Sequence, residues 1–257
     1  MTQSGKAGNP RETKQSARER VAEERRAQAA AQARRDKLFR GGLIALVLVL
    51  VVGIGLAVVF TRKTTAVTSG ARPAGVTADG GIPTGTATKP VVDLYEDFQC
   101  PVCKEYETAI GTDVQGAATS GKAKVVYHIL SFLDGNLNND SSARSANAAG
   151  CAQDQGTFLA FHNEVYKNQP ATEGAGYTDE QLVAFGKTAG VPDMTKFTAC
   201  VKNQTFKDWV VSVQAAGNAV PVTGTPTFIV DGVKVDFSAA KVVTDLRAIF
   251  LKAIGQG

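Results

Sequence analysis

The sequence predicts an α/β fold in which a small sheet is interrupted by a long helical insertion. An apolar run at 91–98 ends in Cys100-Pro101-Val102-Cys103, where a helical pattern begins. Far downstream, Gly224-Thr225-Pro226 directly precedes a second β-rich run at 227–230. Between these segments, residues from about 136 to 220 have helical rather than alternating apolar periodicity. One sheet built from both ends of the domain accounts for this order.

The first half of the predicted sheet lies at 81–130. Residues 91–96 and 124–130 are rich in β-branched and aromatic side chains, which favour strands. A helix is expected between them, from Pro101 to about Ile110, because proline is tolerated in the first helical turn. Gly81-Ile82-Pro83 is expected to add a short edge strand.

The helical insertion is predicted at about 136–220. It opens with a loop at 136–142 that is rich in residues that cap helix N-termini. A later segment begins with Thr178-Asp179-Glu180, which is also a capping signature. The helical patterns predicted in this region are 142–154, 157–168, 178–189, 193–202 and 206–219.

The chain returns to strand after the insertion. Residues 227–230 and 233–235 flank Asp231-Gly232, which is a two-residue hairpin signal. The last helix is predicted at 239–254, where apolar residues recur with the helical period. The predicted order is therefore β-α-β, the insertion, and then β-β-α.

The N-terminal region contains a candidate membrane span. Residues 41–60 have no charge and no proline, and at about 1.5 Å per residue they span a hydrocarbon core of roughly 30 Å. Six Lys and Arg lie in the 20 residues before this run and three in the 20 after it, so the positive-inside rule places the N-terminus in the cytoplasm. We predict a cytoplasmic basic tail at 1–40, a single transmembrane helix at 41–60, a linker at 61–80 and an extracytoplasmic domain at 81–257. A cleaved signal peptide is the alternative.

The charge distribution argues against a nucleic-acid-binding protein. The chain has 28 Lys and Arg against 24 Asp and Glu, which gives a net charge of +4. Residues 1–40 alone have a net charge of +6, so the remainder has a net charge of −2. The basic character therefore belongs to the tail, and no nucleic-acid partner is expected for the folded domain.

Cys100 and Cys103 have the spacing of a redox-active pair. Cys100 is expected at the amino end of a helix, where backbone N–H groups and the helix dipole stabilise a thiolate. Cys103 lies one turn further on the same face and is expected to be buried, so Cys100 would form a mixed disulfide that Cys103 resolves. Zinc is one alternative, although it needs two more ligands at related spacing. A purely structural disulfide is another.

The other two cysteines, Cys151 and Cys200, lie on separate predicted helices of the insertion. An even cysteine count in an oxidising compartment suggests two pairs, so we expect a structural disulfide between them. Two buried free thiols are the alternative.

Four other polar residues have less specific roles. Glu96 or Asp97 is a candidate to assist proton transfer at Cys103, and the sequence does not decide between them; a solvated loop acid is the alternative for either. His128 lies in a predicted strand and His162 beside an aromatic helix face, so both are interpreted as structural.

The two motifs together resemble one branch of a known superfamily. Phe98-Gln99-Cys100-Pro101-Val102-Cys103-Lys104, followed by Gly224-Thr225-Pro226-Thr227-Phe228-Ile229-Val230-Asp231-Gly232, is similar to the DsbA-like branch of the thioredoxin superfamily. The resemblance covers about residues 80–257. It looks especially like the membrane-anchored DsbA-like proteins of actinobacteria, which also have an extra cysteine pair in the insertion.

The resemblance implies a thioredoxin-like fold and thiol–disulfide oxidoreductase activity on exported proteins. It implies that Cys100 is the nucleophile, Cys103 its partner and Pro226 a cis-proline that faces them. The backbone of Thr225 would then bind an extended substrate, and its hydroxyl would contact the sulfurs. No cofactor is expected beyond the redox-active disulfide. A membrane quinone-linked enzyme, either DsbB-like or a vitamin K epoxide reductase homologue, would reoxidise the pair.

Two departures from the family pattern bear on the direction of electron flow. The best-known member has His where this chain has Val102, and Thr225 is also seen before the proline in isomerase and reductase relatives. We expect an oxidase with a less extreme potential, with a reductase or isomerase of the same fold as the alternative. Isomerases usually dimerise through an added domain for which the linker is too small, so a monomer is expected. A non-catalytic peptide-binding module is the alternative from another class.

Overall fold

The computed structural model describes residues 70–256. In chain order the elements are β1 (Ile82–Thr84), β2 (Val91–Glu96), α2 (Pro101–Thr119), β3 (Lys124–Ile129), α3 (Leu133–Leu137), α4 (Ser141–Gln153), α5 (Phe158–Lys167), α6 (Asp179–Thr188), α7 (Met194–Lys202), α8 (Lys207–Asn218), β4 (Thr227–Val230), β5 (Val233–Lys234) and α9 (Val243–Ala253). The predicted tail and transmembrane helix, at 1–40 and 41–60, lie outside the described residues. Between residues 70 and 256, no helix combines the length and the apolar character that crossing a bilayer requires.

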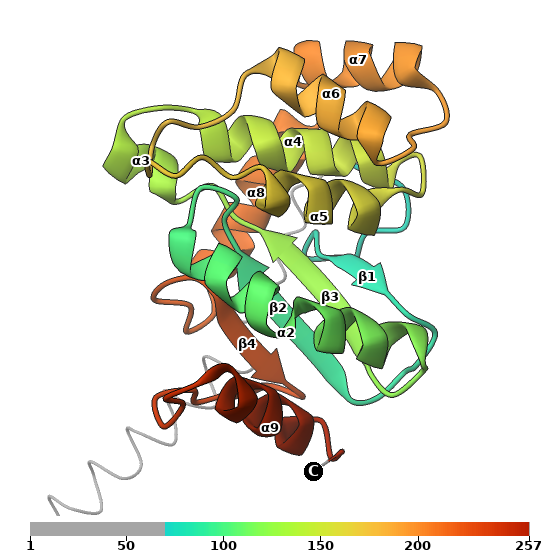
Figure 1. Cartoon of the computed structure of the whole chain (residues 1–257). Helices are drawn as coiled ribbons and strands as arrows, with labels where there is room; N and C mark the ends of the chain where they lie inside the picture. The colour runs from blue at the N-terminus through green and yellow to red at the C-terminus, as the bar shows by residue number, and fades with distance from the viewer. Residues whose placement is uncertain (1–69, 257) are drawn as a thin grey trace, which may run out of the picture. The chain divides into compact units, whose positions relative to one another are not determined.

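The strands form one mixed sheet in the order β1-β3-β2-β4-β5. β2 is parallel to β3 and antiparallel to β4, so that Leu94 lies between Tyr127 and Phe228. Figure 1 shows α2 crossing in front of the sheet and α8 running behind it. Both faces of the central strands are therefore covered, which explains why Val92, Leu94, Tyr95 and Glu96 in β2 are all buried.

Helices α3 to α7 form the insertion and lie together beyond one end of the sheet (Figure 1). α4 is at the centre of this group and packs against α5, α7 and α8. Its small side chains, such as Ala146, Ala148 and Ala149, are buried and allow close helix packing. The thioredoxin-like α/β fold with a helical insertion, which the sequence predicts, is thus confirmed.

Several local predictions are also confirmed. The strands at 91–96 and 227–230 have the bounds that their composition predicts. α6 begins with a capping box, in which Thr178 and Gln181 each accept a backbone N–H of the other.

Three helices differ from the prediction. α2 continues to Thr119 instead of ending near Ile110, because Val114 and Ala117 are buried and their packing outweighs the low helix propensity of Gly111. The short helix α3 was not predicted. α9 begins at Val243 rather than at 239, because the Asp245 carboxylate accepts the backbone N–H groups of Lys241 and Val242 just before the helix.

Part of the predicted linker at 61–80 lies within the described residues and contacts the domain. The backbone N–H of Ala74 donates to Asp154 Oδ1 at 3.1 Å. The indole N–H of Trp209 donates to the carbonyl of Gly80 at 3.0 Å. These hydrogen bonds fix the approach of the chain to β1.

Candidate active site

Cys100 and Cys103 lie at the start of α2, directly after the loop that follows β2. Cys100 is the N-cap residue, and its sulfur accepts a hydrogen bond from the backbone N–H of Cys103 at 3.4 Å. Pro101 begins the helix, where a missing N–H leaves no intrahelical bond unmade. The sulfur of Cys100 therefore lies where the unpaired N–H groups of the helix converge.

The two thiols differ in exposure and in pKa. Cys100 is 7% exposed and Cys103 is fully buried, while Val102 between them is 45% exposed. Hydrogen bonds, first from the Cys103 thiol and then from Thr225 and the α2 backbone, lower the pKa of Cys100 to about 6 against the opposing effect of burial. Burial, above all, raises the pKa of Cys103 well above its usual range. At neutral pH the outer sulfur is a thiolate and the inner sulfur is a thiol.

The segment at Thr225-Pro226 faces this pair. The Thr225–Pro226 peptide bond is cis, and the Cys100 thiol lies 3.4 Å from the Thr225 carbonyl oxygen. The two segments meet because β4, which follows Pro226, is the direct neighbour of β2. The Thr225 hydroxyl is buried near this sulfur, whose pKa it helps to lower, and it has no nitrogen or oxygen hydrogen-bond partner within residues 70–256. The structure thus brings together Cys100, Cys103, Thr225 and Pro226, as the sequence predicts.

Gln169 joins the insertion to the active-site loop. Its side-chain amide donates to the carbonyl oxygens of Phe98 and Cys100 at 2.8 and 3.0 Å. Its own carbonyl accepts a hydrogen bond from Lys104 Nζ at 3.1 Å. The Lys104 ammonium is therefore hydrogen-bonded to the Gln169 backbone carbonyl rather than to the Cys100 sulfur. Gln169 has no signal in the sequence, since only the packing of the insertion places it beside Cys100.

The structure distinguishes the two acids that precede the pair. Both oxygens of Asp97 accept hydrogen bonds, at Oδ1 from the Ser142 hydroxyl and at Oδ2 from the Leu133 N–H, at 2.6 and 3.2 Å. Burial raises its pKa to about 7 despite these bonds. Asp97 therefore connects the active-site loop to the insertion, and its oxygens are occupied.

Glu96 has a different environment on the opposite face of β2. It is fully buried, and burial raises its pKa to about 8. His162 Nε2 lies 2.8 Å from its Oε2, whereas its Oε1 has no hydrogen-bond partner within residues 70–256. The negative charge of Glu96 contributes to the raised pKa of Cys103.

Glu96, Glu107 and His162 form the one group within residues 70–256 whose types and spacing suit a cation, with one atom of each within 4.8 Å of the others. His162 Nε2 and Glu96 Oε2 already share a hydrogen bond, so a cation would have to displace it. The sequence analysis missed Glu107, although its position one turn after Cys103 in α2 is a signal for it. His162 was interpreted as structural, and its aromatic contacts with Phe98, Tyr127 and Tyr166 agree with that.

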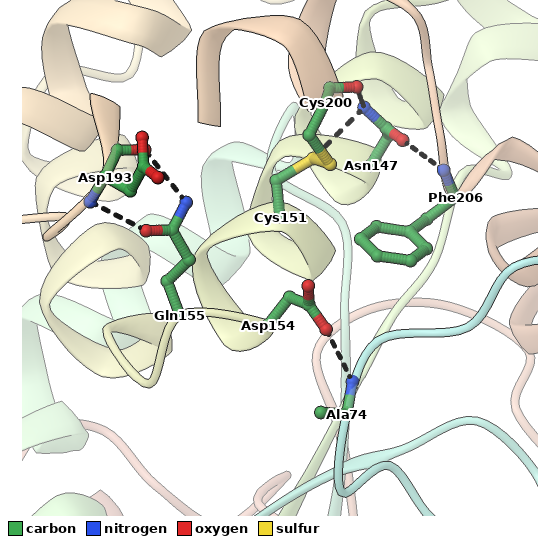
Figure 2. The surroundings of a disulfide bond; sticks show 8 residues. All are labelled: Ala74, Asn147, Cys151, Asp154, Gln155, Asp193, Cys200 and Phe206. Carbon is green, nitrogen blue, oxygen red and sulfur yellow. Dashed lines mark hydrogen bonds between the residues drawn. A yellow bond between two sulfur atoms is a disulfide. The ribbon is translucent and has the colours of Figure 1, made fainter. Parts of the chain in front are cut away.

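The second cysteine pair lies away from this site, between α4 and α7. Cys151 and Cys200 form a disulfide with a Cα–Cα distance of 6.0 Å. Figure 2 shows Asn147 beside it, with its side-chain amide directed at Cys151 Sγ and the Cys200 carbonyl, and its oxygen accepting the N–H of Phe206. The disulfide joins α4 to α7, and Asn147 joins α4 to Phe206, just before α8.

A mixed sheet of this order, with a cysteine pair at the start of α2 and a cis-proline at the start of β4, defines a thioredoxin-type redox centre. The family model described as Thioredoxin matches residues 79–247, which is well over half of the chain. The chain therefore belongs to this thioredoxin family.

Two solved structures and one curated relative show how far the similarity extends. MdbA, a thiol-disulfide oxidoreductase from Actinomyces oris, is 26% identical with a TM-score of 0.61, covering 76% of this chain and 96% of that one. Oxidized Mtb DsbA is 25% identical with a TM-score of 0.56, covering 68% of this chain and 93% of that one. The serine/threonine-protein kinase PknE of Mycobacterium tuberculosis is 26% identical over 131 residues, which is 48% of this chain but only 23% of the kinase.

Proposed function

We propose that this protein is a thiol–disulfide oxidoreductase of the DsbA type that introduces disulfide bonds into exported proteins through Cys100 and Cys103. One observation carries the proposal: Cys100 is a low-pKa sulfur at a helix N-terminus, with a buried thiol behind it and the Thr225 carbonyl in front of it. A structural disulfide needs none of these features. The similarity to MdbA and to Mtb DsbA supports the same activity.

The reaction begins with the oxidised Cys100–Cys103 pair. A substrate thiolate attacks the sulfur of Cys100, a substrate–Cys100 bond forms, and Cys103 leaves with the electron pair of the broken bond. A second substrate thiolate then attacks its partner sulfur, which closes the substrate disulfide and releases the Cys100 thiolate. The substrate loses two electrons and the cysteine pair gains them. Because the pKa of Cys100 is about 6, Cys100 remains a thiolate at neutral pH.

Cys103 needs a proton when it leaves as a thiolate, because burial raises its pKa far above neutral pH. We assign the transfer to Glu96 rather than to Asp97. The oxygens of Asp97 are held by hydrogen bonds from the loop and the insertion, whereas Glu96 has a free oxygen and a pKa near 8. A carboxyl group with such a pKa both donates and accepts a proton at neutral pH.

The proposed location is the outer face of the cell membrane, with the segment at 41–60 as a single-pass anchor and the N-terminus in the cytoplasm. The charge asymmetry around that segment supports this topology. The substrates would be reduced or unfolded exported proteins, bound as extended chains along the Thr225 backbone. The electrons would leave to a membrane quinone-linked reoxidase, either DsbB-like or a vitamin K epoxide reductase homologue. We expect the protein to work as a monomer.

The test is acid-quenched thiol trapping in native cells, with peptide mapping that resolves each cysteine. We expect the Cys100–Cys103 pair to be mostly oxidised, as a disulfide donor requires. A mostly reduced pair would point to a reductase or isomerase instead. Cys100→Ala distinguishes a binding module, because such a module would keep its cellular phenotype without the thiol.

A further inference from the structure

The proposed function leaves the Cys103 proton without a route to solvent, and this inference rests on that function. Cys103 must gain or lose a proton each time the pair is reduced or oxidised. Cys103 and Glu96 are both fully buried. A proton that passes between them therefore still has to cross the protein.

Glu96 lies close to a second carboxyl group. One oxygen of Glu96, one oxygen of Glu107 and a ring nitrogen of His162 all lie within 4.8 Å of one another, so the negative charge of Glu96 helps to raise the pKa of Glu107. Burial raises the pKa of Glu107 to about 8, as it does for Glu96. Two adjacent acids of this kind titrate as a pair, so they share one proton as the pH passes through about 8.

His162 contacts both acids from the insertion. Its Nε2 lies 2.8 Å from Glu96 Oε2, and its Nδ1 lies 4.0 Å from Glu107 Oε2. Burial lowers the pKa of His162, so the ring is neutral. A neutral ring that donates from Nε2 to Glu96 holds the carboxyl group in place without fixing its charge.

Glu107 is the member of this group that reaches the surface. Its side chain is 9% exposed, against 1% for Glu96 and none for His162. It lines a surface cavity of about 390 Å³ between α2 and α5, whose lining includes Lys104 and Asn163 but not Glu96. Glu107 thus lies between the buried carboxyl group and water.

We propose that Glu107 is the outer end of a proton path that runs through Glu96 to Cys103, and that His162 is the positioning residue that holds the two carboxyl groups together. When Cys103 leaves as a thiolate, Glu96 gives it a proton, the proton shared with Glu107 moves to Glu96, and Glu107 takes one from water in the cavity. In the reverse direction Cys103 gives its proton to the pair, and Glu107 releases one to water. Each reduction of the cysteine pair therefore takes one proton from water through Glu107, and each reoxidation returns one.

The surroundings of the path contain few competing charges. The titratable groups around Glu96 are Cys100, Cys103 and Glu107 on α2, Tyr127 on β3, His162 and Tyr166 on α5, and Asp97 next in the chain. The tyrosine pKa values are raised by burial, so both hydroxyls are neutral. The cations that line the cavity are Lys104, which donates to the Gln169 carbonyl, and Lys167.

The test separates the inner step from the outer one. The reduced full-length protein is mixed with excess oxidised glutathione, so that a mixed disulfide forms at Cys100. Its resolution by Cys103 is followed by rapid acid quench and mass spectrometry across pH 6 to 9. We expect Glu107→Gln to slow resolution by roughly tenfold and to remove the rise in rate near pH 8, since general acid–base steps contribute factors of this size or more. Glu105→Gln, an exposed acid on the same helix, is the matched control and should behave like the parent protein.

A second variant reaches Glu107 without changing it. A Cβ added at Gly111 would lie 2.5 Å from Glu107 Oε2, so that carboxylate would have to move away. Alanine is the better helix former, so Gly111→Ala is expected to fold and to slow resolution as Glu107→Gln does. His162→Gln should also lower the rate and flatten the pH profile.

The outcomes are distinguishable. Parent-like rates and pH profiles in Glu107→Gln and Gly111→Ala would overturn the proton path, and a parent-like profile in His162→Gln would overturn its positioning role. If the parent protein itself does not resolve the mixed disulfide, the proposed function fails before the path is tested.

Discussion

Cys100 and Cys103 lie three positions apart at the start of one helix, whereas Cys151 and Cys200 lie 49 residues apart and join two helices. The sulfur of Cys100 receives the N–H groups of a helix start, and its partner lies beside a buried acid. Cys151 is 1% exposed, with an Asn147 amide near its sulfur. The same side chain is therefore a reagent in one place and a crosslink in the other, and the surrounding donors and acids make the difference.

The largest expected difference between the pairs is in activity. Cys100→Ala should reduce the oxidation of a reduced substrate, such as ribonuclease A followed by its regained activity, to the uncatalysed rate, because the attacked sulfur is gone. Below pH 6, where the Cys100 thiol is protonated, the free energy of unfolding of the reduced protein should change by less than about 1 kcal/mol. The double variant Cys151→Ala/Cys200→Ala should keep its activity. Equal losses in the two variants would contradict the assigned division of roles.

The next largest effect is on stability, and it should be larger for loss of the Cys151–Cys200 pair than for loss of Cys100. The Cys151–Cys200 bond closes a loop with a sequence separation of 49, and the loop-entropy argument gives up to about 4 kcal/mol for its removal. Urea unfolding of Cys151→Ala/Cys200→Ala should show a lower midpoint at a similar slope. A double variant as stable as the parent would show that Asn147 and the helix packing suffice.

The pH dependence of alkylation should distinguish Cys100 from an ordinary thiol. Alkylation of the reduced protein by iodoacetamide should become half-maximal near pH 6 at Cys100, because the thiolate is the reacting form. The pKa of Cys100 is lowered from 9.0 to about 6, so its contribution to the stability of the reduced form is complete above pH 9 and is lost as the pH falls through 6.

The oxidised form has no such titration. The difference in unfolding free energy between the reduced and oxidised forms should therefore shift in favour of the reduced form from pH 6 to 9. Glu96, Asp97 and Glu107 titrate in both forms, so taking this difference removes most of their contribution. An alkylation midpoint near pH 9 would contradict the assigned environment of Cys100.

The smallest predicted effect comes from one hydroxyl group. Thr225→Val keeps the shape of the side chain and removes the hydroxyl that helps lower the pKa of Cys100. The alkylation midpoint should rise by less than about one pH unit. Thr119→Val, at the far end of α2, is the matched control and should leave the midpoint unchanged. A lower midpoint in Thr225→Val would show that the hydroxyl destabilises the thiolate.

Whether a site residue can be predicted depends on how far along the sequence its partners lie. Cys100 and Cys103 are recognisable from local spacing, and Pro226 from its position before a strand that completes the sheet. Glu107 could have been found, because it follows Cys103 by one helical turn. Gln169 and His162 could not, because they come from the insertion, and a helix pattern shows which face is apolar but not which strand that face covers.

The same reasoning explains the fold. The strands at 91–96 and 227–230 were predictable because their β-branched residues and turn signals are local. The length of α2 depends on tertiary packing around Val114 and Ala117, which overrides the glycine at position 111. The start of α9 depends on one carboxylate, Asp245, that periodicity does not distinguish from other polar positions.

The hydrogen bond between Trp209 and Gly80 has an optical consequence. The chain contains a single tryptophan, which is buried on α8, donates to Gly80 and would touch any side chain placed at Gly150, next to Cys151. All indole fluorescence of the protein therefore originates beside the crosslinked pair and the entering chain. Emission should report on the docking of residues 74–80 and on the state of Cys151, and should change little when Cys100 exchanges electrons.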